Sequence, residues 1–147
     1  MLVVFPAVRI ARRSRGGSTM SADFTLLVWS VALTVLQAVV AVAGATLQVG
    51  LPALAGSREG LPEIVGWAGR AARAHRNMLE SIALFAALVL VAQAAGKANA
   101  MTALGAQLFF WARLAYAVIY IAGIPWLRTA VWALSVVGLL LIFLQLV

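Results

Sequence analysis

Long apolar runs separated by short polar segments dominate this chain. In the first run no charged residue lies between Asp23 and Arg58. A helix of about 20 apolar residues crosses a bilayer, and three further runs reach or approach that length. With ends placed at glycine, proline and capping residues, the pattern predicts four helices: Ala22 to Gly50, near Pro62 to Ala95, Ala100 to Ala122, and Trp126 to Val147.

The segments between the predicted helices are short and contain glycine or proline. The first, residues 52–61, reads as a polar loop. Pro62 is then expected in the first turn of the second helix, with Glu63 near the positive end of its dipole. Residues 96–99 and 123–125 are predicted turns. Short connections make neighbouring helices antiparallel, which predicts a four-helix bundle with both chain ends on one side of the membrane.

The composition identifies an integral membrane protein. Of the 147 residues, 65% are hydrophobic and 10% are charged, which is more apolar surface than a soluble domain of this size can bury. The chain has no cysteine and a single histidine, His75, so a disulfide framework and a thiolate or histidine-rich metal site are excluded, and no metal is expected. The net charge of +7 does not indicate nucleic-acid binding, because the basic residues form no stripe with interleaved aromatic residues.

Residues 1–20 differ from the rest of the chain. Four of the eleven basic residues lie there, after a short apolar stretch, which is the reverse of a secretory signal. The Gly/Ser-rich composition predicts a flexible basic arm, whereas Met20 followed by Ser-Ala-Asp reads as a natural start with a helix cap. The arm is therefore either part of the native protein or a mis-assigned start. Residues 21–147 form the predicted four-helix membrane domain.

Basic residues near the helix ends predict the orientation of the bundle. Apart from the arm, one end holds only Lys97, and the other end holds Arg58, Arg70, Arg73, Arg76 and Arg128. By the positive-inside rule this arginine-rich end lies in the cytoplasm. The arginines of the arm would then lie outside, which is a second reason to treat the arm as separate.

Polar residues recur at three- and four-residue spacing on two predicted helices, so each set shares one helix face. The second helix carries Arg73, Asn77 and Glu80, flanked by Arg70 and Arg76. The third carries Arg113, Tyr116 and Tyr120. Arginine forks bind carboxylates and an acidic group binds an ammonium, so this mixture suits a small zwitterionic or polyanionic ligand. In the alternative reading Glu80 and Arg113 form a structural ion pair and the tyrosines lie in the membrane interface, and spacing alone favours neither.

At these two segments the chain resembles the MAPEG family, the membrane-associated proteins of eicosanoid and glutathione metabolism. The family pattern Arg-Ala-x-x-Asn-x-x-Glu, followed by a phenylalanine, matches Arg73 to Glu80 with Phe85. Its pattern Ala-Arg-x-x-Tyr-x-x-x-Tyr matches Ala112 to Tyr120. The resemblance covers about residues 22–147 and is closest to the short bacterial members.

The resemblance implies a homotrimer in a bacterial inner membrane, with glutathione bound as co-substrate between subunits at the cytoplasmic end. The expected activity is that of a transferase or peroxidase acting on lipophilic electrophiles, and the alternative is a non-catalytic scaffold or lipid-binding trimer surrounded by membrane lipids. The residues expected to bind glutathione are Arg73, Arg76, Asn77, Glu80 and Tyr116. The expected catalytic residues are Tyr120, Arg113 and Arg128, of which Arg128 is about one residue out of the family's register.

Two positions depart from the family pattern. Glutathione-binding members usually carry an arginine at the end of the first helix, where this chain has the uncharged segment Gln48 to Pro52. The proline often found four residues after the second-helix glutamate is Leu84 here. The first departure removes one expected carboxylate anchor, and the second straightens the helix.

Overall fold

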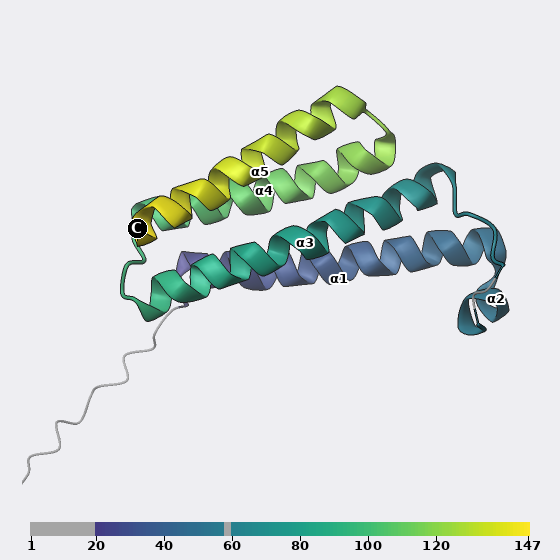
Figure 1. Cartoon of the computed structure of the whole chain (residues 1–147), viewed down its shortest axis with the longest axis horizontal. Coiled ribbons are helices and arrows are strands. Elements are labelled where there is room, and N and C mark those ends of the chain that lie inside the picture. The colour runs from purple at the N-terminus through teal and green to yellow at the C-terminus, as the bar shows by residue number, and fades with distance from the viewer. Residues whose placement is uncertain (1–19, 58–59) are drawn as a thin grey trace, which may run out of the picture.

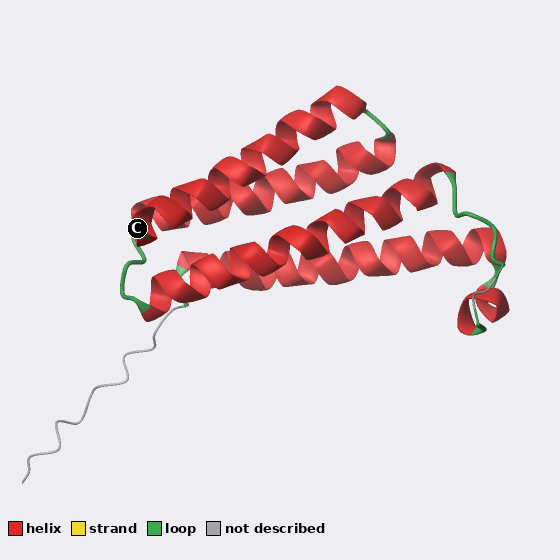
Figure 2. Ribbon diagram, viewed as in Figure 1, coloured by secondary structure: helices red, strands yellow, loops and turns green. Residues whose placement is uncertain are grey.

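The computed structural model describes residues 20–57 and 60–147. The expected basic arm, apart from Met20, and Arg58 lie outside the described residues. Every regular element in the described part is a helix (Figure 2). In chain order (Figure 1) these are α1 (Ala22–Val49), α2 (Leu51–Ala55), α3 (Gly66–Ala94), α4 (Ala100–Ala122) and α5 (Pro125–Leu146).

Four of these helices, α1, α3, α4 and α5, are long and apolar enough to cross a membrane. Large apolar side chains cover their outer faces, with Trp29, Trp111 and Val118 each more than half exposed. Such a surface is stable in lipid and would aggregate in water. The predicted all-α, four-span architecture of an integral membrane protein is confirmed.

Consecutive spanning helices run antiparallel, so that the described chain starts and ends at the same end of the bundle (Figure 1). The arginine-rich end is formed where α1 and α4 finish and α3 and α5 begin. Helix α1 packs against α3 and α4, and α5 packs against the same two helices, whereas α1 and α5 do not contact each other. The α3–α4 pair therefore separates α1 from α5.

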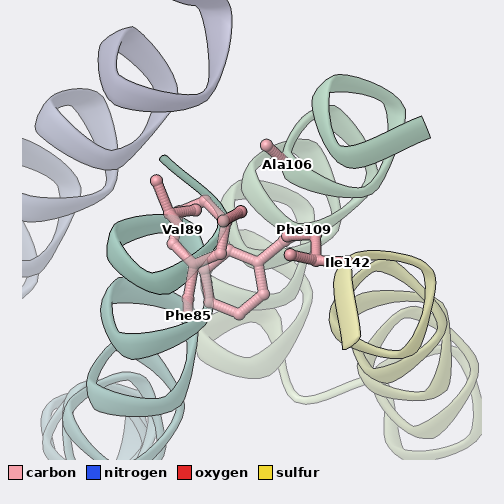
Figure 3. Close-up of a cluster of buried hydrophobic side chains, with 6 residues drawn as sticks. Phe85, Val89, Ala106, Phe109 and Ile142 are labelled. Carbon is pink, nitrogen blue, oxygen red and sulfur yellow. The ribbon is translucent and has the colours of Figure 1, made fainter. Parts of the chain in front are cut away.

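The core lies among α3, α4 and α5 (Figure 3), where Phe85 stacks on Phe109 with ring centroids 4.2 Å apart. Helices α4 and α5 approach most closely at two glycines. A Cβ atom on Gly105 would lie 2.6 Å from the carbonyl oxygen of Gly138, and the reverse distance is also 2.6 Å. Because no real side chain fits there, this pair sets the position of α5 on α4 and hence of the residues that α5 brings to the site.

Polar contacts join the helices at the end opposite the arginines. The buried carboxylate of Asp23 accepts a hydrogen bond of 2.8 Å from Thr102, which links α1 to α4. Gln93 at the end of α3 donates to Ser21, the residue that caps α1. These contacts hold three of the four spanning helices together at this end of the bundle.

Two predicted boundaries are wrong at the start of the second span. Residues 51–55 form the short helix α2 instead of a loop, because Gly50 ends α1 at φ +82° and Pro52 is tolerated in a first turn. The expected helix start near Pro62 moves to Gly66, so Glu63 lies before the helix. The cause is Gln48, whose amide donates to the carbonyl of Val65 and accepts from its N–H, at 2.9 and 3.1 Å. This contact holds Val65 in an extended conformation.

Candidate functional site

Arg113, near the middle of α4, is a positive charge buried in the bundle. Its side chain is 1% exposed. The Nε atom donates to the sulfur of Met78 on α3 at 3.5 Å, and a thioether is only a weak acceptor. Both Nη atoms are buried and have no hydrogen-bond partner within the described chain. The guanidinium is therefore held in place with most of its donors unused.

Two phenol rings lie between two cations in a row that runs from Arg113 toward the arginine-rich end. The Arg113 guanidinium lies 4.7 Å from the ring centroid of Tyr116. The Tyr116 and Tyr120 rings are 5.3 Å apart, and Arg128 on α5 lies 4.6 Å from the ring of Tyr120. Cation–π contacts of this kind favour a fixed arrangement of charge and ring. All three predicted catalytic residues, together with Tyr116, thus belong to one connected row on α4 and α5.

A hollow of about 210 Å³ opens beside this row, between α3, α4 and α5. We call it the α5-side hollow, and it is lined by Asn77, Tyr116, Arg128, Thr129 and Trp132. The Oδ1 atom of Asn77 is buried without a hydrogen-bond partner. An unpaired amide, a phenol and a guanidinium can together bind a polar, negatively charged ligand.

Three further residues predicted to bind the ligand lie on α3, the helix of Asn77, but are exposed. Arg73 and Arg76 are not among the residues that line the α5-side hollow, and Glu80 borders a neighbouring hollow that shares Asn77 and Trp132.

No carboxylate of the described chain lies within 4.0 Å of Arg113, so a single chain does not form the alternative Glu80–Arg113 ion pair.

Thr129 and Trp132 are lining residues that the sequence reasoning missed. Both lie on α5, which carries neither of the two polar patterns that pointed to the site. The available signal was spacing, because Trp132 follows Arg128 by four residues and therefore shares its helix face. Met78 was also missed, because a methionine in an apolar helix gives no sign that it contacts a charge.

Arg70 fixes the end of α4, close to Tyr120. Its Nε atom donates to the carbonyl oxygen of Ile121 at 2.8 Å. Gly123 follows at φ +86°, and a Cβ atom there would lie 3.3 Å from the Arg70 Nε. The left-handed conformation and the close arginine both favour glycine at this position.

Comparison with known proteins agrees with the two motifs. The sequence matches the MAPEG family over residues 24–147, nearly the whole described chain. The searches of curated proteins and of solved structures found no match. The match begins at the third residue of α1 and ends at the last residue of the chain, so it includes all four spanning helices. The chain therefore belongs to the MAPEG family.

Proposed function

We propose that this protein is a membrane-bound, glutathione-dependent transferase or peroxidase that acts on lipophilic electrophiles dissolved in the bilayer. Family membership supports a glutathione-related function of this type. The observation that carries the proposal is the state of Arg113, a buried guanidinium whose Nη donors have no hydrogen-bond partner among the described residues. A buried charge without a partner is costly, and an anionic ligand would supply the missing partner.

The polar groups of α3 and α4 suit the functional groups of glutathione. Its two carboxylates suit the exposed forks of Arg73 and Arg76, and its ammonium suits Glu80. The unpaired amide of Asn77 can bind the peptide part of the ligand, beside the phenol of Tyr116. The sulfur would then lie near the row of cations and phenols on α4 and α5.

The chemical task is to convert a thiol with a pKa of about 8.5 into a thiolate at neutral pH. Arg113 or Arg128 would stabilise the anion, and the hydroxyl of Tyr120 would donate to it, while the proton leaves to water. The thiolate then attacks an electrophilic carbon, forming an S–C bond as the leaving group departs. With a hydroperoxide it attacks the terminal oxygen, the O–O bond breaks, and the leaving alkoxide takes a proton from water to give an alcohol. The sulfenic acid left on the sulfur reacts with a second glutathione to give disulfide and water.

We propose that three copies assemble and complete the site between subunits. Glu80 is exposed about halfway along α3, and a carboxylate at that depth is unfavourable against lipid. A neighbouring subunit would cover it and would also cover the exposed arginines of α3. We place the protein in a bacterial inner membrane with its arginine-rich end on the cytoplasmic side. Glutathione would enter from the cytoplasm, and the electrophile would enter from the lipid, sideways between helices.

A non-catalytic scaffold or lipid-binding trimer is the second candidate, and one contact favours it. Glutathione-binding relatives usually carry an arginine near the end of the first span. In this chain the amide of Gln48 lies there and is used by the backbone of Val65. Its oxygen and one of its N–H groups are therefore already used, and we assign the carboxylate anchors to the arginines of α3.

Turnover in proteoliposomes separates the two candidates. We expect the wild type to conjugate glutathione to chlorodinitrobenzene or to reduce a lipid hydroperoxide. Arg113→Met should lose this activity at least a hundredfold, since removing a transition-state charge contact costs several kcal/mol. Lys97→Met is the matched control, because Lys97 lies at the opposite end and donates to the Leu146 carbonyl. A wild type that neither turns over nor binds glutathione supports the scaffold.

A further inference from the structure

A row of polar residues lies buried along α1, the one spanning helix that contributes nothing to the α5-side hollow. Ser30, Thr34 and Gln37 are spaced four and three residues apart and are all buried. The hydroxyls of Ser30 and Thr34 donate to carbonyls one turn earlier in α1, at 2.8 and 2.7 Å. Gln37 differs from them. Its side chain is 6% exposed, and its Oε1 atom is buried without any hydrogen-bond partner.

Gln37 borders a cavity of about 150 Å³ between α1, α3 and α4, which we call the Gln37 cavity. Every other residue that lines it is apolar. Three buried alanines, Ala71, Ala74 and Ala117, leave the space open because their side chains are short. Leu36 and Val118 also line the cavity and are more than half exposed. The cavity therefore opens toward the lipid phase.

The Gln37 cavity is separate from the proposed glutathione site. It lies on the α1 side of the α3–α4 pair, whereas the hollow of Asn77 and Arg128 lies on the α5 side. No residue lines both. The thiol chemistry proposed above uses neither Gln37 nor the alanines around it.

We infer that the Gln37 cavity binds a small aromatic alcohol taken from the lipid phase. An apolar cavity of about this volume accommodates a single benzene-sized ring. A phenolic hydroxyl can donate to the amide oxygen of Gln37 and accept from its amide nitrogen. No group of the described chain makes either hydrogen bond. An anion is not suited, because none of the described residues that line the cavity is a cation. A water on the amide would leave the rest of the cavity empty, because the other lining residues of the described chain are apolar, whereas a ring fills that space.

Fluorine NMR on the full chain in nanodiscs tests the inference, with 4-fluorophenol and fluorobenzene as probes. The two rings have almost the same size, so the difference between their affinities reports the hydroxyl. We expect saturable binding of both to the wild type, with the phenol about tenfold tighter after correction for partition into empty nanodiscs. Gln37→Leu keeps the volume and removes the amide, and should bring the two affinities to within about twofold of each other.

A second pair of variants tests the location. Ala117→Leu places a larger side chain into the cavity and should abolish saturable binding of both probes. Ala83→Leu makes the same change at an exposed position of α3 and should leave binding unchanged. The inference is overturned if Ala117→Leu binds like the wild type or if the wild type does not prefer the phenol. It is also overturned if Gln37→Leu weakens subunit assembly while the phenol preference persists, since Gln37 would then pair across subunits.

Discussion

Among the fully buried polar side chains of the described chain, Arg113 and Gln37 hold atoms without a hydrogen-bond partner, as the half-buried Asn77 and His75 also do. Thr34 bonds the backbone of its own helix, and Asp23 accepts from Thr102 across the bundle. By contrast, the Arg113 Nη atoms and the Gln37 Oε1 atom have no partner within the described chain. A group left in this state costs free energy on folding, so its presence points to a role that offsets the cost, such as binding or catalysis.

Replacing Arg113 by Met should stabilise the ligand-free protein while removing glutathione binding. Methionine keeps much of the volume beside Met78 and removes a charge whose Nη atoms have no hydrogen-bond partner among the described residues. Replacing a whole buried ion pair or triad by apolar residues raises stability by up to about 4 kcal/mol in other proteins, and removing an unpaired charge should act in the same direction. Thermal unfolding in the same detergent, with and without glutathione, measures both effects. A lower melting temperature for the ligand-free variant would show that Arg113 is already satisfied in the assembled protein.

Tyr120→Phe should raise the pKa of the bound glutathione thiol by about one to two units and slow conjugation. The change keeps the ring that Arg128 contacts and deletes only the hydroxyl, and a hydrogen bond to a charged group contributes about 1.5–3 kcal/mol. The pH dependence of the conjugation rate gives the pKa. Tyr116→Phe is the matched control on the same helix face. If only the control moves the pKa, Tyr116 is the sulfur donor.

At the scale of helices, the sequence pattern predicted those helix ends that depend on residues close to them in the chain. The ends of α1 and α4 agree with the sequence within one residue, because glycine and a side-chain cap act there. The start of α3 was wrong, because it depends on Gln48, seventeen residues before Val65 in the chain. The residues next to Pro62 give no sign of that contact, so the local pattern could not predict where α3 starts.

At the candidate site, too, the sequence predicted what depends on local spacing and missed what depends on how the helices pack. The two polar patterns predicted the residues on α3 and α4, which spacing alone places on common faces. The contribution of Thr129 and Trp132 was missed because it depends on how α5 is turned against α4. That rotation is set at the close crossing of Gly105 and Gly138, which only the assembled bundle reveals.

Gly138→Ala should therefore destabilise the bundle and weaken glutathione binding from a distance. The new Cβ atom would meet the Gly105 carbonyl oxygen at 2.6 Å and the Phe109 nitrogen at 2.8 Å. Overpacking of this kind costs about 1–3 kcal/mol and would shift α5, which carries Arg128. Gly56→Ala is the control, because its nearest contact would be an ordinary 3.5 Å. Thermal unfolding and glutathione titration of the two variants should differ, and equal behaviour would contradict this role for the crossing.

For the whole molecule, the charges left on the outside of one chain argue for assembly. Apolar side chains cover most of the outer surface and are compatible with lipid, but Glu80, Arg73 and Arg76 are exposed on α3 as well. Charges in a spanning helix face a partner, a cavity or a ligand in other membrane proteins. Cyclic association of identical chains would cover all three charges in every subunit.

Native mass spectrometry of the protein released from nanodiscs should show three copies. Glu80→Leu makes the outer face of α3 more compatible with lipid and should raise the fraction of monomer, whereas Leu79→Ala, at an exposed apolar position, should not. A wild type that is monomeric at all concentrations would contradict the trimer and a site between subunits.

The most direct test of the central claim is the ultraviolet difference spectrum of glutathione bound to the purified protein at neutral pH. We predict thiolate absorbance that saturates with glutathione and is accompanied by release of a proton, because the cations around Tyr116 and Tyr120 favour the anion. Arg113→Met should show no such absorbance, and Lys97→Met should match the wild type. Glutathione that binds as the neutral thiol, or thiolate formation that persists in Arg113→Met, would contradict the role assigned to the buried guanidinium.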